Sequence, residues 1–361
     1  TWQAEPTARG ETLADLAGAR LERAQAGHPQ DYEPAIEAYL AAAEVISRED
    51  NPATWGTIMH NLGLAFGSCP TVDPAENLEQ ALAAYNAALE VRTRDQDPAE
   101  WADTLNNLGG IYMRRIHGDR AENLELALRA HVAALEERPR ETAPLAWAQT
   151  MSNLAAVNLE RLLGDEPENV VHALAACRAA LEVRTREAMP VRWAQTMNNL
   201  AAAYLRRPLG ERSENLEEAI VACEAVLQVR TREAMPQLWA ETTNNLAGAY
   251  LERIKGHRRE NARHAANAYE AILAVRTREA IPVPWARTMH NLALAYSALD
   301  LAGEPEAFAR AVDAFGQALE IRTLDVMPAD NLNTQQKLGD LYFGAEQWPE
   351  AVSYTHLRAH E

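Results

Sequence analysis

Six asparagines recur at a constant spacing of 46 residues, and their amide side chains suit the binding of a peptide. An amide donates and accepts hydrogen bonds at once, as a peptide backbone does. The six are Asn61, Asn107, Asn153, Asn199, Asn245 and Asn291. Four longer polar side chains share their helical stripe, four residues before or seven after an Asn: Gln149, Gln195, Arg114 and Arg206. We predict that these ten residues form a ligand-binding stripe.

The spacing also allows a second interpretation of the asparagine column. Each Asn could hydrogen-bond to the neighbouring repeat and tie adjacent helices together, and both roles could hold in different repeats. Another polar column lies one residue earlier, at His60, Asn106, Asn198, Asn244 and His290. We interpret this second column as plain helix surface.

Tryptophan and proline keep the same 46-residue step, which indicates a repeat architecture. The tryptophans are Trp55, Trp101, Trp147, Trp193, Trp239 and Trp285, and the prolines are Pro98, Pro144, Pro190, Pro236, Pro282 and Pro328. A fixed period of ~20–50 residues is typical of a solenoid, in which each unit buries its apolar face against the next. We interpret the Trp column as core at the unit junctions, and not as a stacking platform for a cofactor or base.

The copy that begins at Pro190 contains two helical patterns. The first places apolar residues at i, i+4, i+7, i+8 and i+11 from Trp193, which is one face of an α-helix. Pro190 suits the first helical turn, and Gly210 marks the turn that follows. The second pattern predicts a helix with Asn215 as its N-cap and Glu218 in a capping box. No segment has the period of a strand, so the fold class is all-α, built from helix–turn–helix units.

Residues 1–8 are predicted to be a lead segment and residues 9–352 a single solenoid. The units lie near 9–54, 55–100, 101–146, 147–192, 193–238, 239–284 and 285–330, with a partial unit at 331–352. In the partial unit, the second helix is expected about six residues early, around Trp348 to Val352. Residues 353–361, SYTHLRAHE, resemble the adaptor-derived tail of a translated metagenomic fragment, and we interpret them as non-native. Because the sequence begins at Thr1 without Met, we expect a piece of a longer chain.

The segments 198–201 (NNLA) and 180–184 (ALEVR) resemble the tetratricopeptide repeat. They are similar to the long repeats of kinesin light chains and of bacterial proteins with CHAT (caspase-like) protease domains. The resemblance covers about residues 9–352, although the period is 46 residues and not the usual ~34. It implies a right-handed α-solenoid whose first helices line a concave groove, where the asparagines contact a protein or peptide partner.

The charge and composition restrict the class of partner. The 361 residues are 47% hydrophobic and 24% charged, as in an ordinary folded protein, with a net charge of −18. An acidic solenoid is a poor match for nucleic acid or for an anionic membrane surface, because both attract cations. No apolar run is long enough to span a bilayer. We expect a cytoplasmic protein, and its oligomeric state stays open.

Two further residue types could bind a ligand but have simpler interpretations. The arginine pairs Arg92/Arg94, Arg184/Arg186, Arg230/Arg232 and Arg276/Arg278 could form an anion track. Residues two apart on a helix point to different sides, so we expect helix capping and pairing with Glu187, Glu233 or Glu279. Of the three cysteines, Cys177 and Cys223 share an apolar column and are predicted to be core.

No pattern of residues indicates catalysis. The sequence has no nucleophile elbow, phosphate-binding loop or zinc-protease motif, and its histidines are single and dispersed. We predict no catalytic residues, no metal site and no cofactor. The sequence therefore favours a protein-binding scaffold that is not an enzyme. The alternative is the regulatory arm of a larger enzyme, such as a CHAT protease, whose catalytic domain lies outside this sequence.

Overall fold

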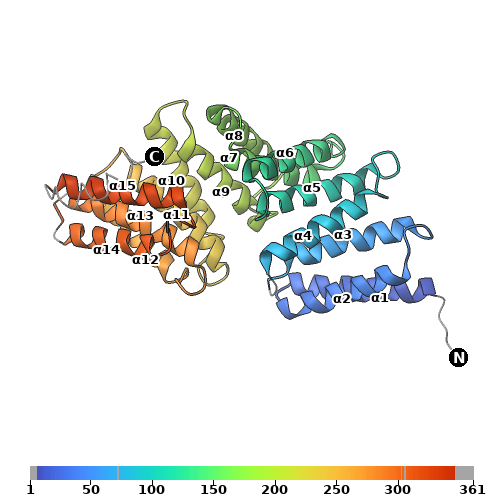
Figure 1. The fold of residues 1–361 in the computed structure, drawn as a ribbon. Coiled ribbons are helices and arrows are strands. Elements are labelled where there is room, and N and C mark those ends of the chain that lie inside the picture. Colours follow the sequence, from blue (N-terminus) through green and yellow to red (C-terminus); the bar gives the residue numbers. More distant parts are fainter. Residues whose placement is uncertain (1–5, 71–72, 302, 305, 346–361) are drawn as a thin grey trace. The chain divides into compact units, whose positions relative to one another are not determined.

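The computed structural model describes residues 6–70, 73–301, 303–304 and 306–345. Within these ranges the chain forms fifteen α-helices, one short 3-10 helix (η1, Pro29–Asp31) and no strand. The first helices of the pairs are α1 (Pro6–Gln25), α3 (Pro52–Ser68), α5 (Pro98–Arg114), α7 (Pro144–Glu160), α9 (Pro190–Arg206), α11 (Pro236–Glu252), α13 (Pro282–Asp300) and α15 (Pro328–Gly344). The second helices are α2 (Tyr32–Val45), α4 (Pro74–Leu89), α6 (Arg120–Glu136), α8 (Glu166–Leu181), α10 (Arg212–Leu227), α12 (Arg258–Leu273) and α14 (Ala307–Leu319). The all-α prediction is confirmed (Figure 1).

Proline and glycine define the helix boundaries, as the repeat pattern predicts. Pro190 is the first residue of α9, where its missing N–H leaves no helical hydrogen bond unmade. Gly210 lies in the turn after α9 with φ of 83°, a left-handed conformation that favours glycine. Gly118, Gly164 and Gly256 occupy the same place in their own repeats with φ between 79° and 82°. The turn within each of these pairs therefore has the same backbone shape.

The predicted start of the second helix is wrong by one turn. α10 begins at Arg212, and its N-cap is Glu211 and not Asn215. Asn215 is buried inside the first turn, where its Nδ2 donates to the carbonyl of Leu209 and its Oδ1 accepts from Arg207. The asparagine therefore fixes the preceding loop and does not cap the helix. Its position in the sequence resembles a cap because both roles require a polar side chain at a helix start.

The chain forms two compact units, Thr1–Arg184 and Thr185–Glu361. In the first unit, α1 to α8 pack as consecutive pairs, and each second helix also packs on the first helix that follows it. The second unit repeats this arrangement from α9 to α15. Consecutive packing of helix pairs makes the fold an α-solenoid. The predictions for Trp348 to Val352 and for residues 353–361 lie outside the described residues.

The first helices form the inner layer within each unit. α1 contacts α3, α3 contacts α5 and α5 contacts α7, whereas no second helix contacts another second helix among the residues that the structure describes. In the second unit, α9, α11, α13 and α15 are related in the same way. When the helices on one side of a stack lie closer together than those on the other side, the stack curves around the closely packed side. The first helices therefore present the concave face in each unit.

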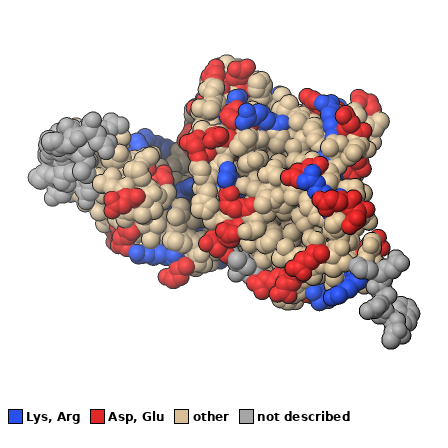
Figure 2. All heavy atoms as spheres, turned by 45° about the vertical axis from the view of Figure 1, so that its right-hand side comes forward, with Lys and Arg blue, Asp and Glu red and all other residues tan. Residues whose placement is uncertain are grey.

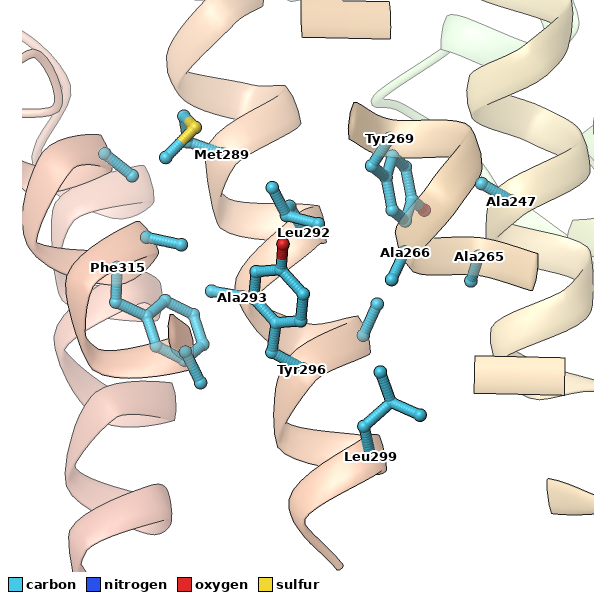
Figure 3. Close-up of a cluster of buried hydrophobic side chains, with 14 of the residues drawn as sticks. Ala247, Ala265, Ala266, Tyr269, Met289, Leu292, Ala293, Tyr296, Leu299 and Phe315 are labelled. Carbon is cyan, nitrogen blue, oxygen red and sulfur yellow. The ribbon is translucent and has the colours of Figure 1, made fainter. Parts of the chain in front are cut away.

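Small residues and large rings alternate in the core between the layers. Ala81, Ala127, Ala173, Ala219 and Ala265 share one column of the second helices and are all fully buried. In the second unit, the rings of Tyr269, Tyr296 and Phe315 fill the space around α13 (Figure 3). Cys177 and Cys223 are fully buried, which confirms their predicted core position. Burying each large apolar side chain stabilises the stack by about 1.5–3 kcal/mol.

Candidate groove on the first helices

Four members of the predicted asparagine column hydrogen-bond to the first helix of the preceding pair. Their Nδ2 atoms contact a polar atom of the residue 47 positions earlier, at 3.1–3.4 Å. The pairs are Asn107 with His60, Asn153 with Asn106, Asn245 with Asn198, and Asn291 with Asn244. These contacts tie adjacent first helices together, as in the second interpretation of the column. Each amide is half-buried, so part of it also faces solvent.

The second polar column is not plain helix surface, and that prediction is wrong. Asn106 and His290 are buried, with exposed fractions of 2% and 6%, and the other members are half-buried. These side chains point between neighbouring first helices and form hydrogen bonds there. Asn106 Oδ1, for example, accepts from both Asn153 Nδ2 and Thr150 Oγ1. The column is exposed on an isolated helix, and stacking of the repeats buries it.

A buried arginine, two or three residues after the end of a second helix, completes this arrangement. Arg138 donates to Thr150 Oγ1 at 2.7 Å, and Arg230 donates to Thr242 Oγ1 at 3.2 Å. Arg92 and Arg322 contact their threonines in the same way, 12 residues ahead. We call this recurring set, an Arg, a Thr and two amide or imidazole side chains, the polar ladder. Burial lowers the pKa of Arg230, which is the cost of holding a guanidinium between the helices.

A hollow of about 200 Å³ opens on the inner layer of the first unit. Asn107, Gly110 and Arg114 of α5 line it, together with Gln149 and Asn153 of α7. Four of the ten predicted residues therefore meet at one place, and α3 forms the opposite wall with Leu64, Gly67 and Ser68. Gly110 has open space where a side chain would project. The combination of amides with an empty glycine position provides room and hydrogen-bonding groups for an extended chain.

Tyr85 of the second helix α4 forms the floor of this hollow. Its side chain hydrogen-bonds to Asn107, and burial raises the pKa of the phenol, so it stays neutral. Arg114 is exposed at the rim and donates to the carbonyl of Gly67 at 2.7 Å. The hollow therefore offers neutral hydrogen-bonding groups on its floor and one cation at its edge. Tyr85 belongs to an apolar column in the sequence, so only its three-dimensional position connects it with the stripe.

The remaining predicted residues lie on the same inner layer but outside this hollow. Asn61 faces α1, and its side chain hydrogen-bonds to Tyr39. In the second unit, Gln195 and Arg206 are exposed on α9, and Asn199 is half-buried between them. Asn245 and Asn291 continue the column along α11 and α13 as described above.

The comparisons with known proteins agree with this architecture. No protein-family model matches the sequence, and no curated protein matches it. Among solved structures, the chain is similar to a signal transduction ATPase with numerous domains (STAND) protein with a tetratricopeptide repeat sensor from Pyrococcus horikoshii, with a TM-score of 0.56 and 16% identity. It is also similar to Cut9–Hcn1, an APC/C hetero-tetramer, with a TM-score of 0.50 and 14% identity. The chain has the tetratricopeptide-repeat fold.

The two matches differ in how much of each protein they cover. The first covers 99% of this chain and 53% of the STAND protein, so the chain spans about half the length of that protein. The second covers 96% of this chain and 71% of the other chain. The kinesin-light-chain and CHAT resemblances stay predictions.

In these tetratricopeptide-type repeats, the two arginines of a pair make different contacts, and both contacts differ from those that the sequence predicted. The first Arg of several pairs belongs to the polar ladder, beyond the end of the helix: α10 ends at Leu227, before Arg230. The second Arg lies over a tryptophan ring, as Arg140 does over Trp147 at 5.1 Å. Its carboxylate partner lies on the following second helix or just after it, as in Arg140–Glu182 at 2.6 Å, and not at the predicted neighbouring Glu.

The tryptophans are also less buried than predicted. Trp285 is buried, with an exposed fraction of 8%, but Trp55, Trp101, Trp147, Trp193 and Trp239 are half-buried. In each case the guanidinium carbon of an Arg lies within 6.0 Å of the centroid of the Trp ring. The guanidinium covers part of the ring that the protein core leaves exposed. The column therefore contributes cation–π contacts at the repeat junctions as well as apolar packing.

The ionisable groups of the described residues are arranged for stability. Burial raises the pKa of Cys177 and Cys223 to about 12, so both thiols stay protonated and unreactive. Burial lowers the pKa of His60, His131 and His290 to about 4, so these imidazoles are neutral at pH 7. Across the described ranges, no group of three or more His, Cys, Asp or Glu side chains could hold a metal ion.

The surface is acidic, as the composition indicates. Carboxylates are spread over the face that Figure 2 shows, with fewer basic side chains among them. Residues 1–184 contain 29 of the 52 acidic residues but only 15 of the 34 basic ones. None of the helices in the described part of the chain is both long and apolar enough to cross a bilayer.

Proposed function

We propose that this chain is a protein-interaction scaffold that holds a peptide segment of a partner protein against its first helices. The hollow between α3, α5 and α7 is the single observation that supports this most directly. It brings Asn107, Arg114, Gln149 and Asn153 together around the empty position of Gly110. Backbone amides of an extended segment can pair with these side chains, and a small side chain fits over Gly110.

The hydrogen bonds of the polar ladder are compatible with this role. The ladder uses the Nδ2 atom of Asn153 to join α7 to α5, which leaves the Oδ1 atom for a ligand. The ladder holds the amide in one orientation, so binding costs little side-chain entropy. A preformed groove of this kind gains affinity from many weak contacts along the stack.

Filling the hollow tests the proposal. Gly110→Leu places a large side chain in open space, and the same column already contains Leu64 and Leu294 on α3 and α13. The variant is therefore expected to fold normally. Random peptides displayed on phage are selected on the wild-type chain, and the selected peptides are then titrated against both proteins. We expect at least a ~10-fold loss of affinity, because the side chain excludes the peptide.

The matched control is Gly316→Leu on the second helix α14. Gly316 also has open space for a side chain, but it lies outside the inner layer. Selected peptides should bind this variant as they bind the wild type. Peptides that bind all three proteins equally would place the interaction surface elsewhere and contradict the proposal.

The second candidate function is the sensor arm of a larger signalling protein. The similarity to a STAND protein with a tetratricopeptide repeat sensor, over 99% of this chain, favours it. In that case the groove would bind a partner that changes the state of a catalytic domain, of the ATPase or caspase-like protease class. Sequencing the native gene beyond both ends of this sequence tests the idea. A catalytic domain in frame would support it, and a stop codon after a capping helix would support a free-standing adaptor.

A further inference from the structure

Three arginines come together in the second unit at a place where other repeats have a carboxylate. Arg287 of α13 lies in the same column as Asp103 and Glu241, on the stripe of the first helices. Asp103 pairs with the ladder arginine 35 residues later, Arg138. Glu241 pairs with the ladder arginine 11 residues earlier, Arg230, at 3.9 Å. The stripe position of a repeat therefore lies beside two ladder arginines, one before it and one after it.

The same spacings place Arg287 beside two ladder arginines, Arg276 and Arg322. Arg276 lies 11 residues before it, and Arg322 lies 35 residues after it. Burial lowers the pKa of both ladder arginines, and the charge of Arg287 acts in the same direction. Two carboxylates act against this effect, Glu241 on Arg276 and Asp330 on Arg322. Each ladder guanidinium is therefore close to the additional cation.

The two ladder arginines lack partners that their equivalents have. Among the described residues, Arg276, Arg287 and Arg322 form no ion pair. The Nε atoms of Arg276 and Arg322 are buried without a hydrogen-bond partner. The hydroxyl of Thr288, 12 residues after Arg276, donates to a backbone carbonyl, and the described chain offers the Arg276 side chain no hydrogen bond. The Arg322 side chain, which is 4% exposed, keeps only its contact with Thr334.

A buried ladder guanidinium is still accessible to an anion from the inner face. The side chain of Arg138 is 6% exposed, yet its Nη2 atom donates to Asp103, which is 57% exposed. The Nη2 atom of Arg322 finds no such acceptor in the described part of the chain. The residue 35 positions earlier is Arg287, whose guanidinium only donates hydrogen bonds. The accessible edge of Arg322 therefore meets a second cation and not a carboxylate.

The nearest carboxylates balance these charges only in part. Asp330 shares the column of Glu100, which pairs with Arg92. The aspartate side chain is one methylene shorter, and it stays beyond ion-pair distance of Arg322. Glu241 is shared with Arg230, which is its partner at 3.9 Å. Three guanidiniums and two carboxylates thus leave a local excess of positive charge on a protein whose net charge is −18.

We propose that Arg276, Arg287 and Arg322 bind the phosphoryl group of a phosphorylated side chain in a partner protein. Such a group carries about −1.5 to −2 charges near pH 7, and its three terminal oxygens accept hydrogen bonds from several directions. A carboxylate is planar and presents two oxygens, so it matches three separate guanidiniums less well. Clusters of arginine are a recurring means of recognising phosphorylated segments. The site belongs to the second unit and does not rest on the peptide groove proposed for the first.

Three capped pentapeptide mixtures test this assignment. They carry phosphoserine, glutamate or serine at the centre and Ala, Leu, Gly or Asn at the other positions. All three are passed over the immobilised full chain at low ionic strength, and mass spectrometry measures the retained fraction. The net charge of −18 repels anionic peptides in general, so their retention reports a local site. We expect about tenfold greater retention of the phosphoserine mixture than of either other mixture, as for a charge-assisted hydrogen bond.

Two matched variants locate the effect. The site variant is Arg287→Gln, which should fold because Gln149 and Gln195 occupy the same column in other repeats, and it should lose the preference for phosphoserine. The control Arg258→Gln removes the same charge from an exposed position on the second helix α12 of the same unit, and it should keep the preference. Circular dichroism checks that both variants fold.

Four results would overturn the inference. The first is equal retention of the phosphoserine and serine mixtures by the wild type. Equal retention of the phosphoserine and glutamate mixtures would indicate a site for any anion and exclude the phosphoryl assignment. The other two are a preference that survives in Arg287→Gln and one that falls equally in Arg258→Gln. The groove of the first unit is judged separately by the Gly110→Leu comparison, so failure of either proposal is distinguishable from failure of the other.

Discussion

Arg138 Nη1 donates a hydrogen bond of 2.7 Å to Thr150 Oγ1, and both side chains are shielded from solvent. Arg138 follows α6, and Thr150 belongs to α7, so the contact joins one pair of helices to the next. Thr150 Oγ1 also lies 3.2 Å from Asn106 Oδ1 on α5. One hydroxyl therefore connects three helices of the first unit. The polar ladder contributes directed contacts where apolar packing alone would leave the angle between repeats less defined.

Replacing this hydroxyl should destabilise the junction. Thr150→Val keeps the shape of the side chain but removes the hydrogen-bond partner of Arg138 Nη1 and one of the two hydrogen bonds to Asn106 Oδ1. We expect a loss of about 1–3 kcal/mol in the free energy of unfolding, the cost of an unsatisfied buried polar group. Hydrogen exchange in α5 and α7, together with urea denaturation, measures it. The same substitution at the exposed Thr12 is the control, and an equally small effect at both sites would contradict the prediction.

The neighbouring surface contact should matter much less. Arg140 lies over Trp147 and pairs with Glu182, but about half of each charged side chain is exposed, 45% and 57%. Arg140→Leu should therefore cost less than ~1 kcal/mol, and the difference should shrink in ~1 M salt, which screens exposed charges. Urea denaturation at low and high salt checks both statements. A loss well above that of Thr150→Val would show that the cation–π contact dominates the junction.

Acid should weaken the folded state through its buried histidines. Burial, with a smaller contribution from a nearby arginine, lowers the pKa of His60, His131 and His290 to about 4. An unfolded chain takes up these protons near pH ~6.5, before the folded chain does. Their contribution to stability is therefore complete above pH ~6.5 and is lost as the pH falls towards 4.

His131→Tyr tests the share of one histidine. Tyrosine is suitable because Tyr85 holds this position in the preceding repeat, and it does not titrate between pH 4 and 7. The variant should lose less stability than the wild type as the pH falls, by on the order of 3 kcal/mol at most. Urea denaturation at several pH values measures the difference. The exposed His172→Gln serves as the control, and identical pH profiles for His131→Tyr and the wild type would refute the assignment.

The sequence predicts local features well and contacts between repeats poorly. The 46-residue period and the proline and glycine positions predict the first helices, because these signals act within one turn of chain. The role of Arg230 could not be predicted in this way. A charged residue near a helix end is usually exposed, and its partner, Thr242, lies on the first helix of the next repeat. Asn215 is a similar case, because the carbonyl that it binds becomes accessible only once the loop has folded.

For the candidate site too, the sequence predicts the position of residues along a helix but not their contacts between helices. The stripe that contains Asn107 and Asn153 follows from helical spacing, and the structure places both on the inner layer. The hydrogen bonds that they form depend on the distance between stacked helices, which periodicity does not give.

The last prediction concerns a pair of columns in which one residue compensates for another. Gly109 packs against the ring of His131, and a Cβ atom added to Gly109 would lie 2.7 Å from the imidazole Cε1. The preceding repeat has Gly63 against Tyr85, with a similar distance of 2.9 Å. Ala155 and Ala201 in the first column stand opposite the smaller Cys177 and Cys223, whereas Ala247 and Ala293 stand opposite the rings of Tyr269 and Phe315. In the four repeats from Gly63 to Ala201, a larger residue in one column accompanies a smaller residue in the other, so the two columns share the space there.

Gly109→Ala alone should destabilise the first unit by about 1–3 kcal/mol through overpacking, although alanine favours the helix. His131→Cys alone should also destabilise it, because the smaller side chain leaves a cavity. The double variant reproduces the alanine–cysteine pair of the next two repeats, so it should be more stable than either single variant. Urea denaturation of the four proteins gives the coupling energy, which we expect to exceed ~1 kcal/mol. Additive losses would mean that the two positions do not share a volume, and the columns would then vary independently.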